Sequence, residues 1–467
     1  MALYDIVIAG ARVIDPDTGT DEILNAGISG GSIAALSRNS LAGKQEIDGG
    51  GLVLAPGFID LHTHEDTIEG GPGPLNKPLE NRFFFPNVIS ACAMRTGNTF
   101  IMGGNCGYSN YPMGAYLEKL EALNLPINCM SLVGNVTLRQ RLGLGDYDRA
   151  SPMQIAKLKS MAAAALKEGA AGISFGLQYA PGTEFGELLA LCSAAAEAGK
   201  FFAVHMRYDV PAIALEGVEE VIAAAKITGA GLQISHLASN VYGENTAGEN
   251  NIKKAALLID EARKGGADIY ADVYPYNVWA TSIQSAVFDQ GVDEFNFEIE
   301  DLELISGEMA GQYCTPELFE KLRNAPEDTM VACHNAMPSE DIEDAYKLEY
   351  ACVGSDALLT LSGDHIKGHP RSAGSPARFL KEFVREKKSF PLIEGLRKLT
   401  LNPAKRLGLE KKGRVQEGCD ADLVLFDFDK IADRASYGID VCALPSEGIR
   451  ALIAGGRLVH SGAAREG

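Results

Sequence analysis

The fold is decided by a nine-residue stretch near the start of the chain, Pro56-Gly-Phe-Ile-Asp-Leu-His-Thr-His64. An apolar run that ends in two histidines is typical of a buried strand whose last side chains carry chemistry. In a strand, residues i and i+2 face the same side, so the imidazoles of His62 and His64 point one way. The alternative is that both are hydrogen-bonded core histidines. This alternative is the weaker one, because the two histidines share a face at the end of a strand.

From this stretch onward, β-rich runs alternate with Ala-rich helical stretches. The candidate strands are eight in number: 57–64, 99–106, 129–134, 172–177, 201–207, 232–237, 268–276 and 351–358. Alternation of strand and helix predicts right-handed βαβ units and a parallel sheet. Eight such units predict an α/β fold closed into a (β/α)8 TIM barrel; an open doubly wound sheet is the alternative.

Two of the intervening helices have clear end signals. Ser151 is the expected N-cap, and Pro152 occupies the first helical position. Residues 153–168 are rich in helix-forming residues, and Gly169 is expected to end the helix. A second helix is predicted over Asn251–Lys264, because its apolar positions recur at helical spacing and two glycines follow.

Both ends of the chain depart from this alternation. Residues 1–55 and 413–467 contain short strands punctuated by glycine, which predicts a small β-sandwich formed by both termini. The expected domains are therefore a discontinuous sandwich, 1–55 and 405–467, and a barrel over 56–404. A long stretch at about 287–346 is predicted to be an insertion that serves as a lid or a subunit contact.

The composition limits the classes of partner. The chain has 467 residues with 42 Lys and Arg against 62 Asp and Glu, a formal charge of −20. Such a charge argues against nonspecific binding to nucleic acid or to an anionic membrane. The sequence shows no apolar block of 18 residues and no basic-then-apolar leader, so no membrane partner is expected. The nine cysteines lack the paired short spacings of a disulfide framework, so the expected location is the reducing cytoplasm. The sequence leaves open whether the protein forms a homo-oligomer.

Four further polar residues end candidate strands. His205 and His236 each follow an apolar run, Cys106 lies among three glycines, and Asp356 ends the last strand. Because barrel active sites form at the carboxyl ends of the strands, these residues and the His62/His64 pair are expected to meet in one place. The alternatives are that the histidines are buried in the core, that Cys106 is a small buried thiol, and that the Asp356 carboxylate caps a loop. Mixed nitrogen, sulfur and oxygen donors predict zinc, since Mg²⁺ and Ca²⁺ prefer oxygen.

At this constellation the chain resembles the amidohydrolase superfamily. The resemblance covers nearly the whole chain, and several motifs are similar to the N-acyl-D-amino-acid deacylase (D-aminoacylase) branch. These motifs are Gly104-Asn-Cys-Gly-Tyr108, Gly176-Leu-Gln-Tyr-Ala-Pro-Gly182, His205-Met-Arg207, Asp272-Val-Tyr-Pro-Tyr276 and His369-Pro-Arg371.

The resemblance implies a zinc ion held by Cys106, His205 and His236. It also implies a second, weaker divalent metal at His62, His64 and the Asp356 position. Many relatives bridge two metals with a carboxylated lysine on the fourth strand. The fourth strand here, 172–177, contains no lysine, so that bridge cannot form from it.

One departure affects the substrate. The branch has a lysine two residues after the sixth-strand histidine, where this chain has Ala238. A substrate carboxylate therefore needs another cation, for which Arg207, Arg371 and Lys367 are candidates; arginine is the better one because its fork binds a carboxylate in bidentate fashion. Arg207 could instead form a structural ion pair.

Two tyrosines complete the predicted substrate site. Tyr179 and Tyr276 are expected to line the pocket or to hydrogen-bond a tetrahedral oxygen, with ordinary packing as the alternative.

The implied activity is zinc-dependent hydrolysis of an N-acyl-D-amino acid to a D-amino acid and a carboxylate. Zinc lowers the pKa of bound water toward about 7, so metal-bound hydroxide is the expected nucleophile, and Asp356 the expected proton shuttle. Alternatives are a cyclic amide hydrolase, as in hydantoinases and dihydroorotases, an isoaspartyl-dipeptidase-like enzyme, and an inactive scaffold on the same fold. The presence of all the expected ligands disfavours the scaffold.

Overall fold

The computed structural model describes residues 3–64, 88–207, 212–241, 250–289, 297–334, 336–362 and 365–461. The strands form two parallel sheets, a sheet built from both ends of the chain, a smaller three-stranded antiparallel sheet and a two-stranded hairpin. Within these ranges no helix combines the length and the apolar character needed to cross a membrane.

All eight predicted strands are present, and all of them pair in parallel. They are β6 (Phe58–Asp60), β7 (Asn98–Gly103), β8 (Asn128–Ser131) with β9 (Val133–Gly134), β10 (Gly172–Gly176), β11 (Phe201–His205), β12 (Gly231–Ile234), β13 (Ile269–Val273) and β17 (Ala351–Val353). One sheet has the order β6-β7-β8 and the other β9-β10-β11-β12-β13-β17. Most of their residues are buried, and all those of β10 and β11 are, as expected for parallel strands covered by helices.

Backbone contacts join the two parallel sheets at both of their edges. At one edge, Leu132 N donates to Gly103 O at 3.0 Å, and Ala171 N donates to Ser131 O at 2.8 Å. At the other edge, Thr63 and Ala357 form a parallel bridge. The residues that follow β6 are thereby brought next to those that follow β17.

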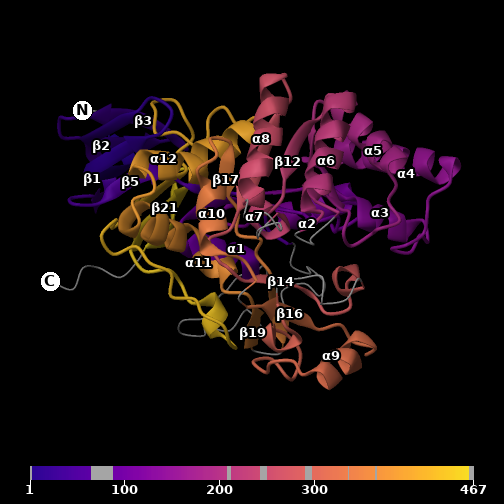
Figure 1. The fold of residues 1–467 in the computed structure, drawn as a ribbon. Helices are drawn as coiled ribbons and strands as arrows, with labels where there is room; N and C mark the ends of the chain where they lie inside the picture. The colour runs from indigo at the N-terminus through magenta and orange to yellow at the C-terminus, as the bar shows by residue number, and fades with distance from the viewer. Residues whose placement is uncertain are drawn as a thin grey trace.

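Helices connect these strands and pack around them (Figure 1). They are α1 (Val88–Arg95), α2 (Met113–Ala122), α3 (Asn135–Arg141), α4 (Pro152–Glu168), α5 (Phe185–Glu197), α6 (Ala214–Thr228), α7 (Leu237–Asn240), α8 (Asn251–Lys264), α10 (Ser339–Tyr346), α11 (Arg371–Phe379), η5 (Leu380–Glu386), α12 (Leu392–Leu396), η6 (Arg397–Leu401) and α13 (Asn402–Arg406).

The predicted caps of two helices are confirmed. The Ser151 side chain accepts a hydrogen bond from Gln154 N and forms a capping box, and α4 ends at Gly169 with a φ of 119°. Helix α8 covers the predicted residues and ends at Gly265.

The two ends of the chain meet in one sheet. Its strands are β1 (Leu3–Asp15), β2 (Thr20–Ser29), β3 (Ser32–Ser37), β4 (Ala42–Asp48), β5 (Val53–Pro56), β20 (Leu423–Phe426), β21 (Ile449–Ala454) and β22 (Arg457–Ser461). The order is β22-β21-β20-β5-β1-β2-β3, and β4 also pairs with β1. In Figure 1 the indigo strands of the N-terminus accordingly lie on the same side as the C-terminal β21.

A smaller antiparallel unit follows β13. It contains β14 (Trp279–Ser282), η2 (Ala286–Phe288), η4 (Ile299–Asp301), β15 (Leu302–Leu304), α9 (Pro316–Arg323) and β16 (Met330–Cys333), with strand order β14-β16-β15. It has its own aromatic core, which includes Trp279, Phe288 and Phe297. A hairpin of β18 (Leu359–Ser362) and β19 (His365–Gly368) and the short helix η7 (Val441–Ala443) complete the described elements.

Candidate active site

The structure brings together all six residues predicted at the strand ends. Their donor atoms form two overlapping groups, each with all atoms within 4.8 Å of one another: Cys106, His205 and His236 in one, and His62, His64, Cys106 and Asp356 in the other. The residues come from the ends of β6, β7, β11, β12 and β17. The parallel pairing of these strands makes the convergence possible, because it puts their carboxyl ends on one side.

The first group is a buried cluster of one thiol and two imidazoles. Cys106 Sγ lies 3.5 Å from His236 Nε2, and the rings of His205 and His236 have centroids 4.5 Å apart. Burial by itself raises the pKa of the Cys106 thiol, but His62 and His236 outweigh it and hold that pKa well below its usual value. A thiolate is the form of cysteine that binds metals.

The second group shares Cys106 with the first and adds a carboxylate. Asp356 Oδ1 lies 2.9 Å from His64 Nε2 and 3.3 Å from His62 Nε2. Burial works against ionisation of Asp356, yet the Arg371 guanidinium and His62 lower its pKa well below the usual range. The pKa of His64 is in turn raised to about 9 by Asp356 and Cys106, against the effect of burial.

These donors fit a zinc ion. The Cys106, His205 and His236 group offers three ligands of the sulfur and nitrogen types that zinc prefers. Three protein ligands are also the number typical of catalytic zinc, whose fourth position stays open for water or substrate. The second group, His62, His64, Cys106 and Asp356, could hold a further divalent cation.

Asp272 supports both groups, a role that was not predicted from the sequence. Its Oδ1 accepts hydrogen bonds from His62 Nδ1 and from His236 N, each at 2.8 Å, and its Oδ2 accepts one from Gln233 at 2.8 Å. Asp272 therefore fixes the ring of one predicted ligand and the backbone of another. The sequence does contain an indication of this role, because Asp272 is the first residue of the motif Asp272-Val-Tyr-Pro-Tyr276.

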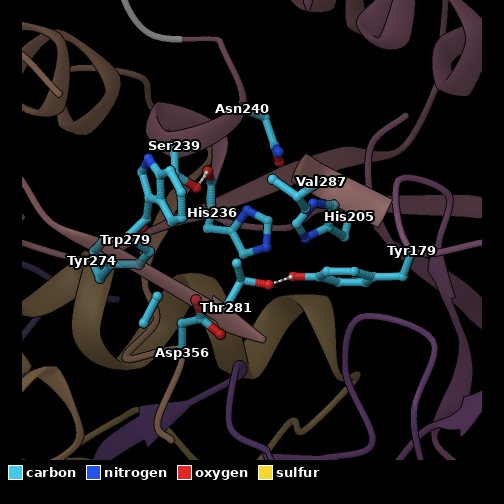
Figure 2. Close-up of a pocket in the computed structure, with 11 residues that line it drawn as sticks. Tyr179, His205, His236, Ser239, Asn240, Tyr274, Trp279, Thr281, Val287 and Asp356 are labelled. Carbon is cyan, nitrogen blue, oxygen red and sulfur yellow. Dashed lines mark hydrogen bonds between the residues drawn. The ribbon is translucent and has the colours of Figure 1, made fainter. Parts of the chain in front are cut away.

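A pocket opens beside the first group (Figure 2). Its empty volume is about 400 Å³, open mouth included. Figure 2 shows the rings of His205 and His236 at its centre, with Tyr179 on one side and Trp279 and Tyr274 on the other. The lining residues are Tyr179, His205, His236, Ser239, Asn240, Tyr274, Trp279, Ala280, Thr281, Val287 and Asp356.

Of the four predicted substrate-binding residues, Tyr179 lies in this lining. Its ring packs on His205 with centroids 4.5 Å apart, and its hydroxyl accepts a hydrogen bond from Thr281 Oγ1 at 3.4 Å. Tyr276 does not line the pocket, and its hydroxyl donates to Asp433 at 3.3 Å.

The two predicted arginines lie outside the lining as well. Arg207 forms an ion pair with Glu220 at 3.0 Å and donates to the backbone carbonyls of residues 181 and 183, which matches the structural alternative. Arg371 is buried behind Asp356, to which it pairs at 2.7 Å. Trp279, Thr281 and Asn240 also line the pocket, and none of them was predicted from the sequence.

Comparisons with known proteins indicate the family of this chain. The model of the Amidohydrolase family matches residues 352–460. Curated relatives include an N-acyl-D-glutamate deacylase of Alcaligenes xylosoxydans xylosoxydans, 31% identical over 97% of this chain and 93% of the relative. A D-aminoacylase of the same organism is 28% identical over 93% of this chain and 90% of the relative.

Solved structures give the same result. An N-acyl-D-glutamate deacylase of Bordetella bronchiseptica, complexed with zinc and a phosphonate inhibitor, has a TM-score of 0.83 at 26% identity, covering 98% of this chain and 97% of that one. A D-aminoacylase has a TM-score of 0.82 at 25% identity with the same coverage. The predicted resemblance is thus confirmed, and the chain belongs to the amidohydrolase family, in the branch of the N-acyl-D-amino-acid deacylases.

Proposed function

We propose that this protein is a zinc-dependent hydrolase that cleaves N-acyl-D-amino acids to a D-amino acid and a carboxylate. The observation that carries the proposal is the group of Cys106, His205 and His236 beside a pocket that Asp356 also lines. The relatives named for this activity cover nearly the whole chain and support the assignment.

Cys106, His205 and His236 are the proposed ligands of the tightly bound ion, and His62 and His64 those of a second one. Bound zinc supplies a Lewis acid for the amide carbonyl and an activated water at neutral pH.

Asp356 is the proposed proton carrier. Its carboxylate is held by Arg371 on one oxygen and by His64 on the other, at 2.7 and 2.9 Å, while its side chain lines the pocket. A carboxylate fixed in this way can take the proton of the attacking water and return it to the departing nitrogen.

Arg371 is the proposed partner of the substrate α-carboxylate. Its Nη1 atom is buried and has no hydrogen-bond partner among the described residues, although the other terminal nitrogen is paired with Asp356. Tyr179 is proposed to hydrogen-bond the tetrahedral oxygen, since its ring packs directly on His205.

We also propose the finer architecture predicted from the sequence. The contacts at both edges of the two parallel sheets support their closure into one (β/α)8 barrel over 56–404. The mixed sheet of 1–55 and 405–467, with β4 and β5 both pairing with β1, supports a small sandwich. Nine free cysteines, eight of them buried, support a reducing compartment such as the cytoplasm.

The activity is tested with the zinc-loaded protein and four substrates: N-acetyl-D-methionine, its L enantiomer, hydantoin and dihydroorotate. We expect hydrolysis of the D enantiomer alone. Turnover of the cyclic amides with none of N-acetyl-D-methionine would replace the proposal with a cyclic amide hydrolase.

The proton-carrier role is tested with Asp356→Asn. General acid–base catalysis contributes about 10²–10⁴-fold, so kcat should fall by that factor while zinc stays bound. Near-normal kcat in zinc-loaded Asp356→Asn would contradict the role.

A further inference from the structure

The first residue of helix α11 is Arg371, which holds the proposed proton carrier. Its guanidinium pairs with Asp356 Oδ2 at 2.7 Å, and its Nε donates to Asp356 O at 2.7 Å. The guanidinium also lies 4.7 Å from the ring centroid of Tyr274, a residue that lines the pocket. The position of the N-terminus of α11 therefore decides where this guanidinium lies relative to Asp356.

His369 precedes this helix by two residues and is completely buried. Its Nδ1 accepts a hydrogen bond from Arg371 N at 3.0 Å, so the hydrogen of the neutral ring is on Nε2. Burial and the Arg371 guanidinium hold the pKa of His369 well below its usual value, which keeps the ring neutral. In this form Nε2 donates to Tyr437 Oη, 3.1 Å away. Because both ring nitrogens are engaged, the orientation of the ring is fixed.

Tyr437 comes from a distant part of the chain, the connection 427–448 between β20 and β21 of the terminal sheet. Its ring packs on His369 and on His334, with centroids 5.1 and 4.6 Å apart. His334 directly follows β16 of the insertion, and its Nε2 pairs with Glu303 of β15 at 2.7 Å. The insertion and the connection of the terminal sheet thus meet at Tyr437, next to His369.

Tyr276 gives His369 a second contact with the same connection. Its ring packs edge-on against His369, with centroids 5.6 Å apart and planes at 89°. Its hydroxyl donates to Asp433 of the connection at 3.3 Å. His369 is therefore held by two aromatic rings, each of which is linked to the segment between β20 and β21.

We infer that His369 is a positioning residue for the proposed hydrolysis, since it fixes the backbone of Arg371 and thereby the guanidinium that holds Asp356. Tyr437 in turn fixes His369, so the terminal sheet contributes to the active site through this residue. The inference rests on the proposed function and adds to it two residues outside the pocket lining. A misplacement of about 1 Å in such a site can cost on the order of 100-fold in rate.

Two variants of His369 test the contact with Arg371. His369→Leu removes the acceptor, whereas His369→Asn keeps an oxygen or nitrogen at the position of Nδ1. In the zinc-loaded enzyme, kcat/KM for N-acetyl-D-methionine should fall about 100-fold in His369→Leu and at most about tenfold in His369→Asn. Zinc content and circular dichroism should match the wild-type protein. No loss in His369→Leu, or equal losses in both variants, would contradict the inference.

A double-mutant cycle distinguishes positioning from a purely structural role. If His369 acts through Arg371, His369→Leu should lower kcat/KM by no more than about twofold when Arg371→Ala is already present. A loss of about 100-fold in both backgrounds would show that His369 acts independently of Arg371.

The contribution of the terminal sheet is tested with Tyr437→Phe, which keeps the ring and removes the hydroxyl. Loss of one hydrogen bond should lower kcat/KM about two- to tenfold, and this loss should disappear when His369→Leu is present. Tyr313→Phe is the matched control, because Tyr313 packs on the same His334 but is 51% exposed. It should retain the wild-type kcat/KM. Equal values for the two tyrosine variants would overturn the role of Tyr437.

Ligand binding separates this inference from the proposed function. Trp279 is the one tryptophan in the chain and lines the pocket, so its fluorescence reports on occupancy. The ligands are D-methionine and D-methioninamide, which lacks the carboxylate. His369→Leu should weaken binding of D-methionine about tenfold and leave that of D-methioninamide unchanged. This result without hydrolysis by the wild-type enzyme would refute the proposed function alone, whereas equal weakening of both ligands would overturn the inference.

Discussion

Three residues of the site adopt backbone conformations that L-amino acids rarely take. The φ angles of Cys106, His236 and Asp356 are 52°, 34° and 50°. Such conformations cost on the order of 1–3 kcal/mol each and persist where the surroundings fix them. At these strand ends the backbone turns sharply, and the turn directs the thiol, the imidazole and the carboxylate to a common point.

The sequence predicted these residues because each comes at the end of a candidate strand, which is a local signal. It did not predict the role of Asp272, whose hydrogen bond to His62 joins residues 210 positions apart. The ion pair of Arg207 with Glu220 was likewise left open, because only the packing of α6 against the end of β11 decides it.

Asp272→Asn tests the support of the metal ligands. The amide can no longer accept hydrogen bonds from both His62 and His236 as the carboxylate does, so the ligands lose their fixed orientation. We expect zinc affinity to fall about 10- to 100-fold, measured by competition with a chromophoric chelator.

The control for this variant is Asp422→Asn, since Asp422 is similarly buried at 3% but lies beside the terminal sheet, where it binds Lys412 and Asn128. It should retain the wild-type zinc affinity. Equal affinities of all three proteins would show that Asp272 does not support the ligands.

At the scale of elements, close backbone packing positions the turn after β7. A Cβ added to Gly107, which has a φ of 83°, would lie 2.6 Å from Gly176 N at the end of β10 and 2.6 Å from a methyl group of Val136. The turn that presents Cys106 can therefore approach β10 only because residue 107 has no side chain.

Gly107→Ala should destabilise the protein by about 2–4 kcal/mol, since it adds overpacking to backbone strain. Gly143→Ala separates the two effects, because Gly143 has a similar φ of 71° and nothing within 4 Å of an added Cβ. Thermal unfolding should show a clearly larger loss for Gly107→Ala, together with weaker zinc binding. Equal losses would mean that strain alone is responsible.

The parallel strands could be predicted because burial on both faces gives them continuous apolar runs. The insertion could not be predicted in detail, because β14, β15 and β16 are three or four residues long and pair across long connections. The pocket wall that contains Trp279 was missed for this reason.

For the whole molecule, one link between the two chain ends is a buried carboxylate. Asp15 is fully buried at the end of β1 and accepts hydrogen bonds from Val415 N at 3.2 Å and from Gln416 Nε2 at 2.9 Å. The sequence predicted that the terminal segments pair, but it could not identify this contact, which joins residues 400 positions apart.

Asp15→Ala should lower the free energy of unfolding by about 1–3 kcal/mol, because the buried Val415 N–H and the half-buried Gln416 amide lose their acceptor. Asp21→Ala is the matched control, since Asp21 forms a largely exposed ion pair with Arg12 that contributes at most about 1 kcal/mol. Urea unfolding monitored by circular dichroism compares the variants. Coincident curves for the two would contradict a structural role for Asp15.

X-ray absorption at the zinc edge tests the central claim most directly. The wild-type protein loaded with one equivalent of zinc should show a single sulfur neighbour at about 2.3 Å together with nitrogen or oxygen neighbours at about 2.0–2.1 Å. The sulfur signal should vanish in Cys106→Ser and persist in Cys352→Ser, a buried cysteine outside both donor groups. A zinc ion with no sulfur neighbour in the wild-type protein would contradict the account.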